Sequence, residues 1–442
     1  MHTRREFLRR GTRLGLAAAT SSLWGTSRGL RAFAQAPTSA YKAVVVVTMT
    51  GGNDGNNMIV PMNAAEYNQY ASVRKNLALS RSALNPLSGS SGLPSYGLHP
   101  SLRNIAAMYN AKQAVAIANV GPLARPVTKD QLLANASLRP AELFDHVAGF
   151  QQWESAQTIA PPTTGWGGRV GDYIVGQSGA LPPVLNGGGE SIFTVGNTVQ
   201  GVCVQTGSAW PALLPGMNEV IQNIAQSDSS SANRLVAATA KLRSASMQQQ
   251  VLIDQAMSYG TLKTQFNGST TFGQTMRTIA SIINGRSVIG ATRQIFYVQQ
   301  GAYDTHASQL DGQSASLNDL DNVIGSFMAA LDEMGLTDQV LVCTHSDFCR
   351  TVTPNTNGGT DHAWGNHQLM LGGGINGGRI IGTMPDFELG GSTDFNGLGV
   401  WIPTLSVTQM TAAIAAWLGL NNSQIASVFP DLPNFTSGAV SL

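Results

Sequence analysis

The 442 residues are enough for a large hydrophobic core, built as one large α/β domain or as two smaller domains. Charge is sparse, with 26 basic and 25 acidic residues, and no basic stripe suggests nucleic acid as a partner. The cysteines, Cys203, Cys343 and Cys349, are odd in number and form no CxxC motif, so they imply no disulfide framework.

The first 36 residues predict an export signal. Residues 3–9 (TRREFLR) contain the consecutive arginines and the Phe-Leu pair of a twin-arginine signal. A moderately apolar segment follows at 14–24, and residues 34–36 (AQA) offer a small-x-small cleavage site. We therefore expect export through the twin-arginine translocon and a periplasmic or secreted mature protein. The alternative is a basic amphipathic helix that stays attached.

Removal of the signal changes the charge of the chain. Residues 1–36 hold seven Arg and one Glu, which leaves 19 of the 26 basic and 24 of the 25 acidic residues, a net charge of −5. No later apolar run approaches the length of a transmembrane segment, so none is expected in the mature chain.

Strand-like and helix-like segments alternate over residues 37–442. This alternation predicts a three-layer α/β/α domain around a doubly wound, mostly parallel sheet, with a mainly helical insertion at about 200–290. Strands are expected at 42–48, 114–119, 294–299, 339–344, 367–371 and 379–382, with shorter strand-like pieces at 183–185 and 192–195. Helices are expected at 64–74, 101–112, 140–157, 166–175, 217–259, 272–283, 314–334 and 406–418.

Acidic and imidazole side chains follow three of the predicted strands. Asn53 and Asp54 lie in a glycine-rich turn after the first strand, Asp304 and His306 follow the strand at 294–299, and His345 and Asp347 end the strand at 339–344. A loop then adds Asp361, His362 and His367. Because the carboxyl ends of parallel strands share one edge of a sheet, we expect these side chains to lie close together.

This mixture of imidazoles and carboxylates suits two divalent metal ions. The ligands do not choose among Zn²⁺, Mn²⁺ and Ca²⁺, although imidazole favours Zn²⁺ or Mn²⁺ over Ca²⁺. Each residue alone also has an ordinary interpretation. The Asn53-Asp54 segment suits a plain turn, His306 a surface position, His345 a satisfied core histidine, and His362 and His367 ordinary loop positions.

Several motifs, in this order, carry a resemblance: GGNDGNN, LHPSL, DH…QQWE, GWGGR, GAYDTH, THSDFCRT, GGTDHAWGNH and LGGGINGGRIIG. The chain resembles an exported bacterial family of unknown function within the alkaline phosphatase/sulfatase-like superfamily. The resemblance implies a phosphatase-like α/β fold with two divalent metals. It implies Asp54 and Asp347 as ligands of one metal, and Asp304, His306 and His362 as ligands of the other.

The chain departs from the superfamily pattern at the expected nucleophile. The family often has Ser-His where this chain has Asp145-His146, and Ser-Glu-Phe-Gly-Arg where it has Ser-Asp-Phe-Cys-Arg at 346–350. Asp145 or a metal-bound water would then replace the missing hydroxyl, with His146 as a general acid or an extra ligand. We expect Arg350 to hold the oxygens of a small anionic ester. The alternatives without a catalytic role are a structural salt bridge for Arg350 and a helix-surface position for His146.

Two functions follow from these features. The first is a metal-dependent hydrolase of phosphate or sulfate esters. The second is a catalytically degenerate binding or assembly protein on the same fold, because fold alone does not determine chemistry. The sequence lacks a GxSxG elbow, a Walker A motif and a GxGxxG after a strand, which disfavours α/β-hydrolases and nucleotide-binding enzymes.

Overall fold

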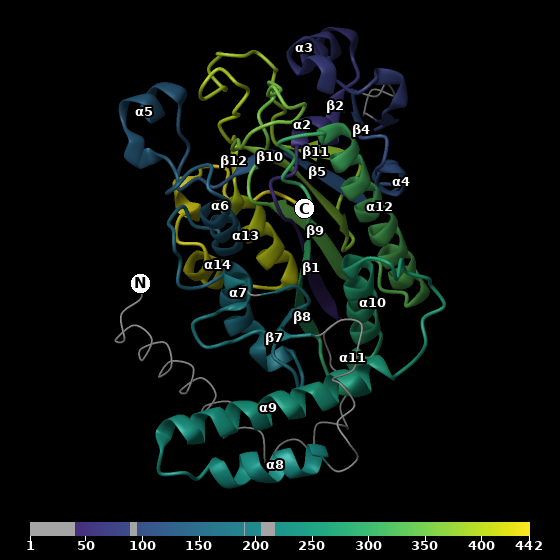
Figure 1. Cartoon of the computed structure of the whole chain (residues 1–442), viewed down its shortest axis with the longest axis vertical. Coiled ribbons are helices and arrows are strands. Elements are labelled where there is room, and N and C mark those ends of the chain that lie inside the picture. The colour runs from purple at the N-terminus through teal and green to yellow at the C-terminus, as the bar shows by residue number, and fades with distance from the viewer. Residues whose placement is uncertain (1–39, 89–94, 190, 205–216) are drawn as a thin grey trace.

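The computed structural model describes residues 40–442 except 89–94, 190 and 205–216 (Figure 1). The expected signal at 1–36 lies outside the described residues, so its export role stays a prediction. Within the described part of the chain, none of the helices combines the length and the apolar character needed to cross a membrane.

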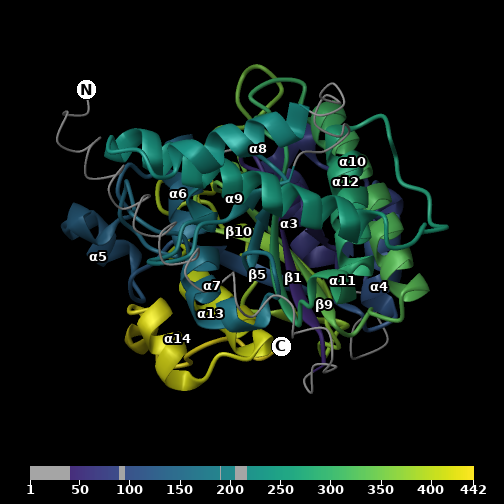
Figure 2. The same cartoon turned by 90° about the horizontal axis from the view of Figure 1, so that it is seen from below.

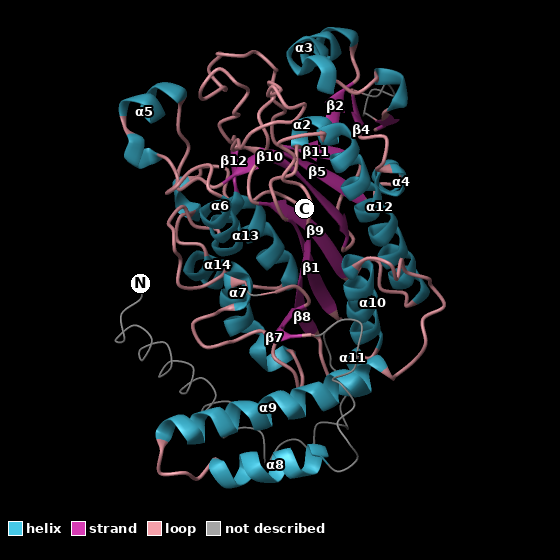
Figure 3. Ribbon diagram, viewed as in Figure 1, coloured by secondary structure: helices cyan, strands magenta, loops and turns pink. Residues whose placement is uncertain are grey.

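A mixed, mostly parallel sheet forms the centre of the molecule (Figure 3). Strand β1 (Lys42–Met49) lies between β8 (Arg293–Gln300) and β9 (Val340–Ser346) and runs parallel to both. The prediction that these three strands share one sheet is confirmed. The strand order is β11-β5-β10-β9-β1-β8-β6-β7, with β12 paired to β5. The remaining strands of this sheet are β5 (Ala114–Gly121), β6 (Val184–Asn186), β7 (Val202–Cys203), β10 (Asn366–Gly372), β11 (Arg379–Ile381) and β12 (Leu405–Ser406).

Helices cover both faces of the sheet (Figures 1 and 2). Alternate side chains of β1 point to opposite faces, as strand geometry requires. Val45 and Val47 pack with α4 (Arg103–Asn110), α10 (Thr271–Asn284) and α12 (Gln309–Glu333). Val44 and Val46 belong to the core of the other face, which holds the helices α6 (His146–Ser155), α7 (Trp166–Ile174), α13 (Val407–Leu418) and α14 (Asn422–Val428). The predicted three-layer α/β/α architecture is confirmed.

Strand β10 is reversed relative to its neighbours. It pairs antiparallel with both β5 and β9, while β5 is parallel to β11 and β12. The amino end of β10 therefore lies at the same edge of the sheet as the carboxyl end of β9. The long loop between these two strands stays at that edge.

The other elements are shorter or peripheral. They are α2 (Gly55–Met58), β2 (Ile59–Pro61), α3 (Ala64–Arg74), β3 (Asn85–Pro86), β4 (Tyr96–Leu98), α5 (Lys129–Ala134), α8 (Met217–Asp228), α9 (Arg234–Met257) and α11 (Arg286–Ile289). Strands β2, β3 and β4 form a small separate sheet. In Figure 1, α8 and α9 lie at the end of the molecule opposite α2 and α3. The expected helical segment at about 200–290 contains α8 and α9 and also α10, which packs on the main sheet.

One predicted strand is wrong. Residues 192–195 were expected to be extended, but Ile192–Thr194 form a short 3-10 helix, η6. The reason is local capping, because the Ser191 hydroxyl accepts a hydrogen bond from the Phe193 N–H. The Glu154 carboxylate of α6 also accepts one from the Ile192 N–H, at 3.0 Å.

Candidate metal centre

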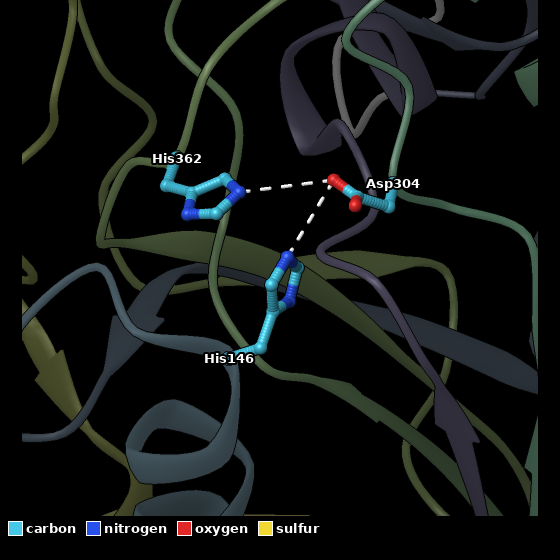
Figure 4. Close-up of side chains that lie close together, drawn as sticks. All are labelled: His146, Asp304 and His362. Atoms are coloured by element: carbon cyan, nitrogen blue, oxygen red, sulfur yellow. Dashed lines mark ion pairs between the residues drawn. The ribbon is translucent and has the colours of Figure 1, made fainter.

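Three imidazoles and one carboxylate meet at the carboxyl edge of the sheet. Asp304 and His306 follow β8, His362 lies in the loop before β10, and His146 is the first residue of α6. The Oδ1 atom of Asp304 lies 3.5 Å from Nε2 of His146, 3.1 Å from Nε2 of His306 and 3.7 Å from Nε2 of His362. Figure 4 shows the rings of His146 and His362 directed at this carboxylate.

The second nitrogen of each ring is held by an oxygen. The Nδ1 atom of His146 lies 2.8 Å from Oδ2 of Asp347, and that of His306 lies 2.9 Å from Oδ1 of Asp361. The Nδ1 atom of His362 lies 2.7 Å from the carbonyl oxygen of Phe144. An oxygen in each of these places accepts a hydrogen bond, so Nδ1 carries the proton in the neutral ring and Nε2 carries a lone pair. The same arrangement orients histidine ligands in known metal sites.

This donor set fits a divalent metal. Four ligand atoms bound to one Zn²⁺ at about 2.0–2.1 Å would lie about 3.3 Å apart in a tetrahedron. The separations between Asp304 Oδ1 and the three ring nitrogens bracket that value. The group whose ligand atoms all lie within 4.8 Å of one another consists of His146, Asp304 and His362, with His306 beside it. The Nε2 atoms of His306 and His362 are 2.9 Å apart, so two lone pairs face each other and a cation there would offset their repulsion. The Nη1 atom of Arg350 lies 3.4 Å from Nε2 of His306 and supplies part of that charge. The sequence-predicted ligands Asp304, His306 and His362 are therefore brought together, and His146 joins them.

Burial and neighbouring charges shift the pKa values of the ionisable side chains in the centre. The hydrogen bond to Asp347 raises the pKa of His146, whereas burial lowers the pKa of His362. Partial burial acts to raise the pKa of Asp304, but the Arg350 guanidinium and the nearby imidazoles outweigh it, and the pKa lies below its ordinary value. Asp304 is thus an anion at neutral pH, as a metal ligand must be.

Arg350 is part of the scaffold beneath the centre. Its side chain is fully buried and donates to the carbonyl oxygens of Gly52 at 2.8 Å and Thr360 at 3.1 Å. It also bonds the Gly51 carbonyl and the Asp304 carboxylate. Gly51 and Gly52 both adopt positive φ, and a Cβ at Gly52 would lie 2.5 Å from the Phe348 ring, so this turn requires glycine. The geometry favours the salt-bridge alternative for Arg350 over contact with a substrate.

Asp54 and Asp347, expected to share a second metal, have different partners. The buried Asp54 carboxylate pairs with Arg74, accepts from Gln309, and accepts from the Asn56 N–H at 3.0 Å. Asp347 accepts from the Gly51 N–H at 3.1 Å and holds His146. Asp54 thus has the surroundings of a structural ion pair, and its assignment as a ligand stays a prediction. The geometry supports one metal position, and the second stays a prediction as well.

Three of the possible additional ligands lie in the protein interior. The Asn53 side chain accepts from Gln313 at 3.1 Å, and the Asn119 N–H donates to Nδ1 of His367 at 3.0 Å. His345 bonds the Thr48 hydroxyl and packs edge-on against Trp153. Burial lowers the pKa of His345 to about 3 and that of His367 to about 4. For His345 the structure favours the ordinary interpretation of a core histidine. His367 is a buried residue of β10 and does not have the loop position that was its ordinary interpretation. Asp361 supports His306 from behind.

Asp145, at the predicted nucleophile position, and Cys349 both have structural roles. Asp145 is the exposed N-cap of α6, and its Oδ1 accepts from the Ala148 N–H at 2.9 Å. Its carboxylate thus serves the helix, which contributes His146 to the centre. Cys349 is a buried thiol whose pKa burial raises to about 12, so it has the properties of a core residue.

Sequence reasoning missed two kinds of partner. The Phe144 carbonyl that orients His362 is a backbone group, and a backbone acceptor leaves no residue-type signal. Arg74 was not recognised as the partner of Asp54, because the two residues lie 20 positions apart and meet only through the packing of α3.

Comparison with known proteins gives a family match and weak structural similarities. The family model described as "Protein of unknown function (DUF1501)" matches residues 41–431. No curated protein sequence matches the chain.

Among solved structures, a sulfatase from Pseudoalteromonas sp. is 10% identical with a TM-score of 0.33, over 86% of this chain and 69% of that one. A protein in the alkaline phosphatase superfamily from Vibrio parahaemolyticus is 10% identical with a TM-score of 0.32, over 92% and 74%. An alkaline phosphatase from an Antarctic bacterium is 10% identical with a TM-score of 0.32, over 79% and 96%. Similarities this weak establish no activity. The family match covers most of the chain, and this protein therefore belongs to the DUF1501 family of proteins of unknown function.

Proposed function

We propose that this protein is a metal-dependent hydrolase of phosphate or sulfate esters. The observation that carries the proposal is the convergence of three imidazole Nε2 atoms on Asp304 while every Nδ1 is held by an oxygen. A divalent ion bound there would supply Lewis acidity toward an ester oxygen. Zn²⁺ and Mn²⁺ fit a histidine-rich donor set better than Ca²⁺ does.

The chain's own residues have separate tasks in this proposal. His146, His306, His362 and Asp304 hold the ion. Asp347, Asp361 and the Phe144 carbonyl fix the orientation of the rings. Arg350 fixes the Asp304 carboxylate. Because these groups are held before substrate arrives, little reorganisation is needed when charge develops on the ester.

A second candidate function is metal binding without turnover, in a binding or assembly protein. One observation favours it: the start of α6 offers the helix-capping carboxylate of Asp145 where a hydroxyl nucleophile was expected. The nearby guanidinium of Arg350 is also buried and bonded to the scaffold.

Metal analysis and a substrate panel test the proposal. The mature protein is purified without chelator and its metal content measured, beside the double variant His306→Ala, His362→Ala. An aryl phosphate, a phosphodiester and an aryl sulfate are then assayed with and without added metal. Metal-dependent turnover in the wild type and its loss in the double variant support a hydrolase. Bound metal without turnover on any substrate favours the second function.

We also propose export by the twin-arginine route with cleavage after Ala36. The consecutive Arg4 and Arg5 and the small residues at 34–36 support this. Amino-terminal sequencing of the exported protein would test the cleavage position, and replacement of both arginines by lysine should retain the protein inside the cell.

A further inference from the structure

A groove of about 710 Å³ opens beside the candidate metal centre. His146 and Asp347 belong both to its wall and to the centre, so the two sites are continuous. One face of α6, the turn η6 and the end of β8 supply the rest of the wall. Its apolar lining residues are Val147, Phe150, Ile192 and Val195, and its uncharged polar ones are Gln151, Ser191 and Gln299.

Apart from the His146 imidazole, which belongs to the metal centre, the groove offers no cationic side chain to a ligand. None of the described residues that line it is lysine or arginine. Its carboxylates, Glu154 and Asp347, already accept hydrogen bonds from protein groups. The guanidinium of Arg350 is buried in the turn behind the centre. An anionic group inside the groove would therefore lack a lysine or arginine partner and lie near the Asp347 carboxylate.

The walls of the groove are tied together by Glu154. Its carboxylate accepts from the Ser191 hydroxyl at 2.6 Å and the Ile192 N–H at 3.0 Å, which joins α6 to η6. It also accepts from the Tyr297 hydroxyl at 2.5 Å, which joins α6 to β8. The groove is thus formed before a ligand arrives, and it has the size of ordinary small-molecule sites.

We propose that this groove binds the organic part of the ester, and that this part is uncharged and largely apolar, such as an aryl or alkyl group. The inference rests on the proposed function, because it places the anionic group of the ester at the metal centre. Val147 is 65% exposed, directly beside His146, and would be covered by such a group. The amides of Gln151 and Gln299 are suited to one hydroxyl or carbonyl on the ligand.

Binding of stable ester mimics to metal-loaded protein tests the inference by calorimetry. Phenylphosphonate, methylphosphonate and 3-phosphonopropionate share the anionic head and differ in the attached group. We expect phenylphosphonate to bind about tenfold more tightly than methylphosphonate, because its ring leaves water. We expect 3-phosphonopropionate, with its second anion, to bind no more tightly than methylphosphonate. Equal affinity for the phenyl and methyl compounds, or tightest binding of 3-phosphonopropionate, would overturn the inference.

A matched pair of variants locates the binding. Val147→Asp places a charge in the groove, whereas Val251→Asp makes the same change at a position of α9 that is 48% exposed. The preference for phenylphosphonate should disappear in Val147→Asp and persist in Val251→Asp. Persistence of the preference in both variants would place the aryl group elsewhere and overturn the inference.

The metal content of the same samples separates this inference from the proposed function. If the wild type binds no metal, the proposed function fails, and 2-naphthol then serves as a probe that needs no metal. Binding of 2-naphthol that Val147→Asp abolishes would still support an apolar ligand groove. No binding of 2-naphthol to metal-free protein would overturn it.

Discussion

The Nε2 atoms of His306 and His362 lie 2.9 Å apart, although each ring already has its Nδ1 atom beside an oxygen acceptor. Two lone pairs in this position repel each other, and a cation between or beside them offsets the repulsion: a proton, a metal ion, or the Arg350 guanidinium, whose Nη1 atom lies 3.4 Å from Nε2 of His306.

We predict that metal saturates this centre at one ion per chain and that the double variant His306→Ala, His362→Ala loses it. Saturating metal at about 1,000 times its dissociation constant should stabilise the wild type by about 4 kcal/mol and the double variant by almost nothing. Elemental analysis and thermal unfolding with and without metal would measure both effects. Unchanged metal content in the double variant would contradict the assignment.

Asp361 should strengthen metal binding and contribute little to the stability of the fold. Its carboxylate is 59% exposed and holds the Nδ1 atom of His306. Removal of such an orienting partner commonly weakens metal binding by about 10- to 100-fold. We expect this loss in Asp361→Ala by competition with a chelator, and no loss in Asp332→Ala, an exposed acidic position on α12. Equal affinities in the two variants would remove Asp361 from the centre.

Substitution of Asp54 distinguishes a role in a structural ion pair from a role as ligand of a second metal. Asp54→Asn leaves the buried Arg74 guanidinium without its counter-charge, and breaking a buried pair costs about 3–5 kcal/mol. Urea unfolding should show this loss, while the metal content of the folded variant stays that of the wild type. A fall in metal content from two ions to one, with little change in stability, would instead make Asp54 a ligand.

Arg350→Ala should destabilise the protein strongly. The substitution removes the donor from the carbonyl oxygens of Gly51, Gly52 and Thr360, and a buried acceptor left without a donor costs about 1–3 kcal/mol. The Asp304 carboxylate is half exposed and can be rehydrated, so we expect the loss in the free energy of unfolding to come from these carbonyl groups. The substrate-binding role expected from the sequence would instead lower turnover at a nearly unchanged melting temperature. Urea unfolding and kinetics on the same sample decide between the two, and unchanged stability with a specific kinetic loss would restore the substrate-binding role.

Glu154 should make stability depend on pH. Burial raises its pKa from 4.5 to about 7, against the effect of its hydrogen bonds. The folded protein therefore keeps this proton to higher pH than the unfolded chain does. The free energy of unfolding should fall as the pH rises from about 4.5 to about 7, by at most about 3 kcal/mol from this residue.

The comparison of variants isolates this contribution. Glu154→Gln does not titrate and should flatten the fall in stability across that pH range, although the loss of an acceptor lowers stability at every pH. Glu219→Gln, an exposed position on α8, should keep the slope of the wild type. Identical slopes in all three proteins would show that Glu154 titrates normally.

The sequence predicted the fold well because the buried strands leave a strong local pattern. The β-branched run at 42–48 has to be covered on both faces, which implies two helical layers. Because the carboxyl ends of parallel strands lie at one edge of the sheet, the sequence also predicted that Asp304 and His306 lie close together at the centre. It could not separate Asp54 from Asp347, because both follow strand ends and only the packing of α3 gives Asp54 an arginine partner.

The sequence was less informative about His146 and Arg350. The centre needs an imidazole from the first turn of α6, but the direction of that ring depends on Asp347, 201 residues away. Arg350 lies close to Asp347 in the chain, which suggested a role in substrate binding. The turn at Gly51 and Gly52 instead presents carbonyl oxygens to its guanidinium, and no local pattern predicts that contact.

The reversal of β10 bears on how much this protein can vary in length. The segment between β9 and β10 is tethered at both ends to neighbouring strands, and it carries Asp347 near one end and His362 near the other. An insertion there would alter the spacing between a ring support and a ligand, so we expect few length changes among relatives. The helix pair α8–α9 lies at the far end of the molecule (Figure 1), and there relatives should tolerate insertions and deletions.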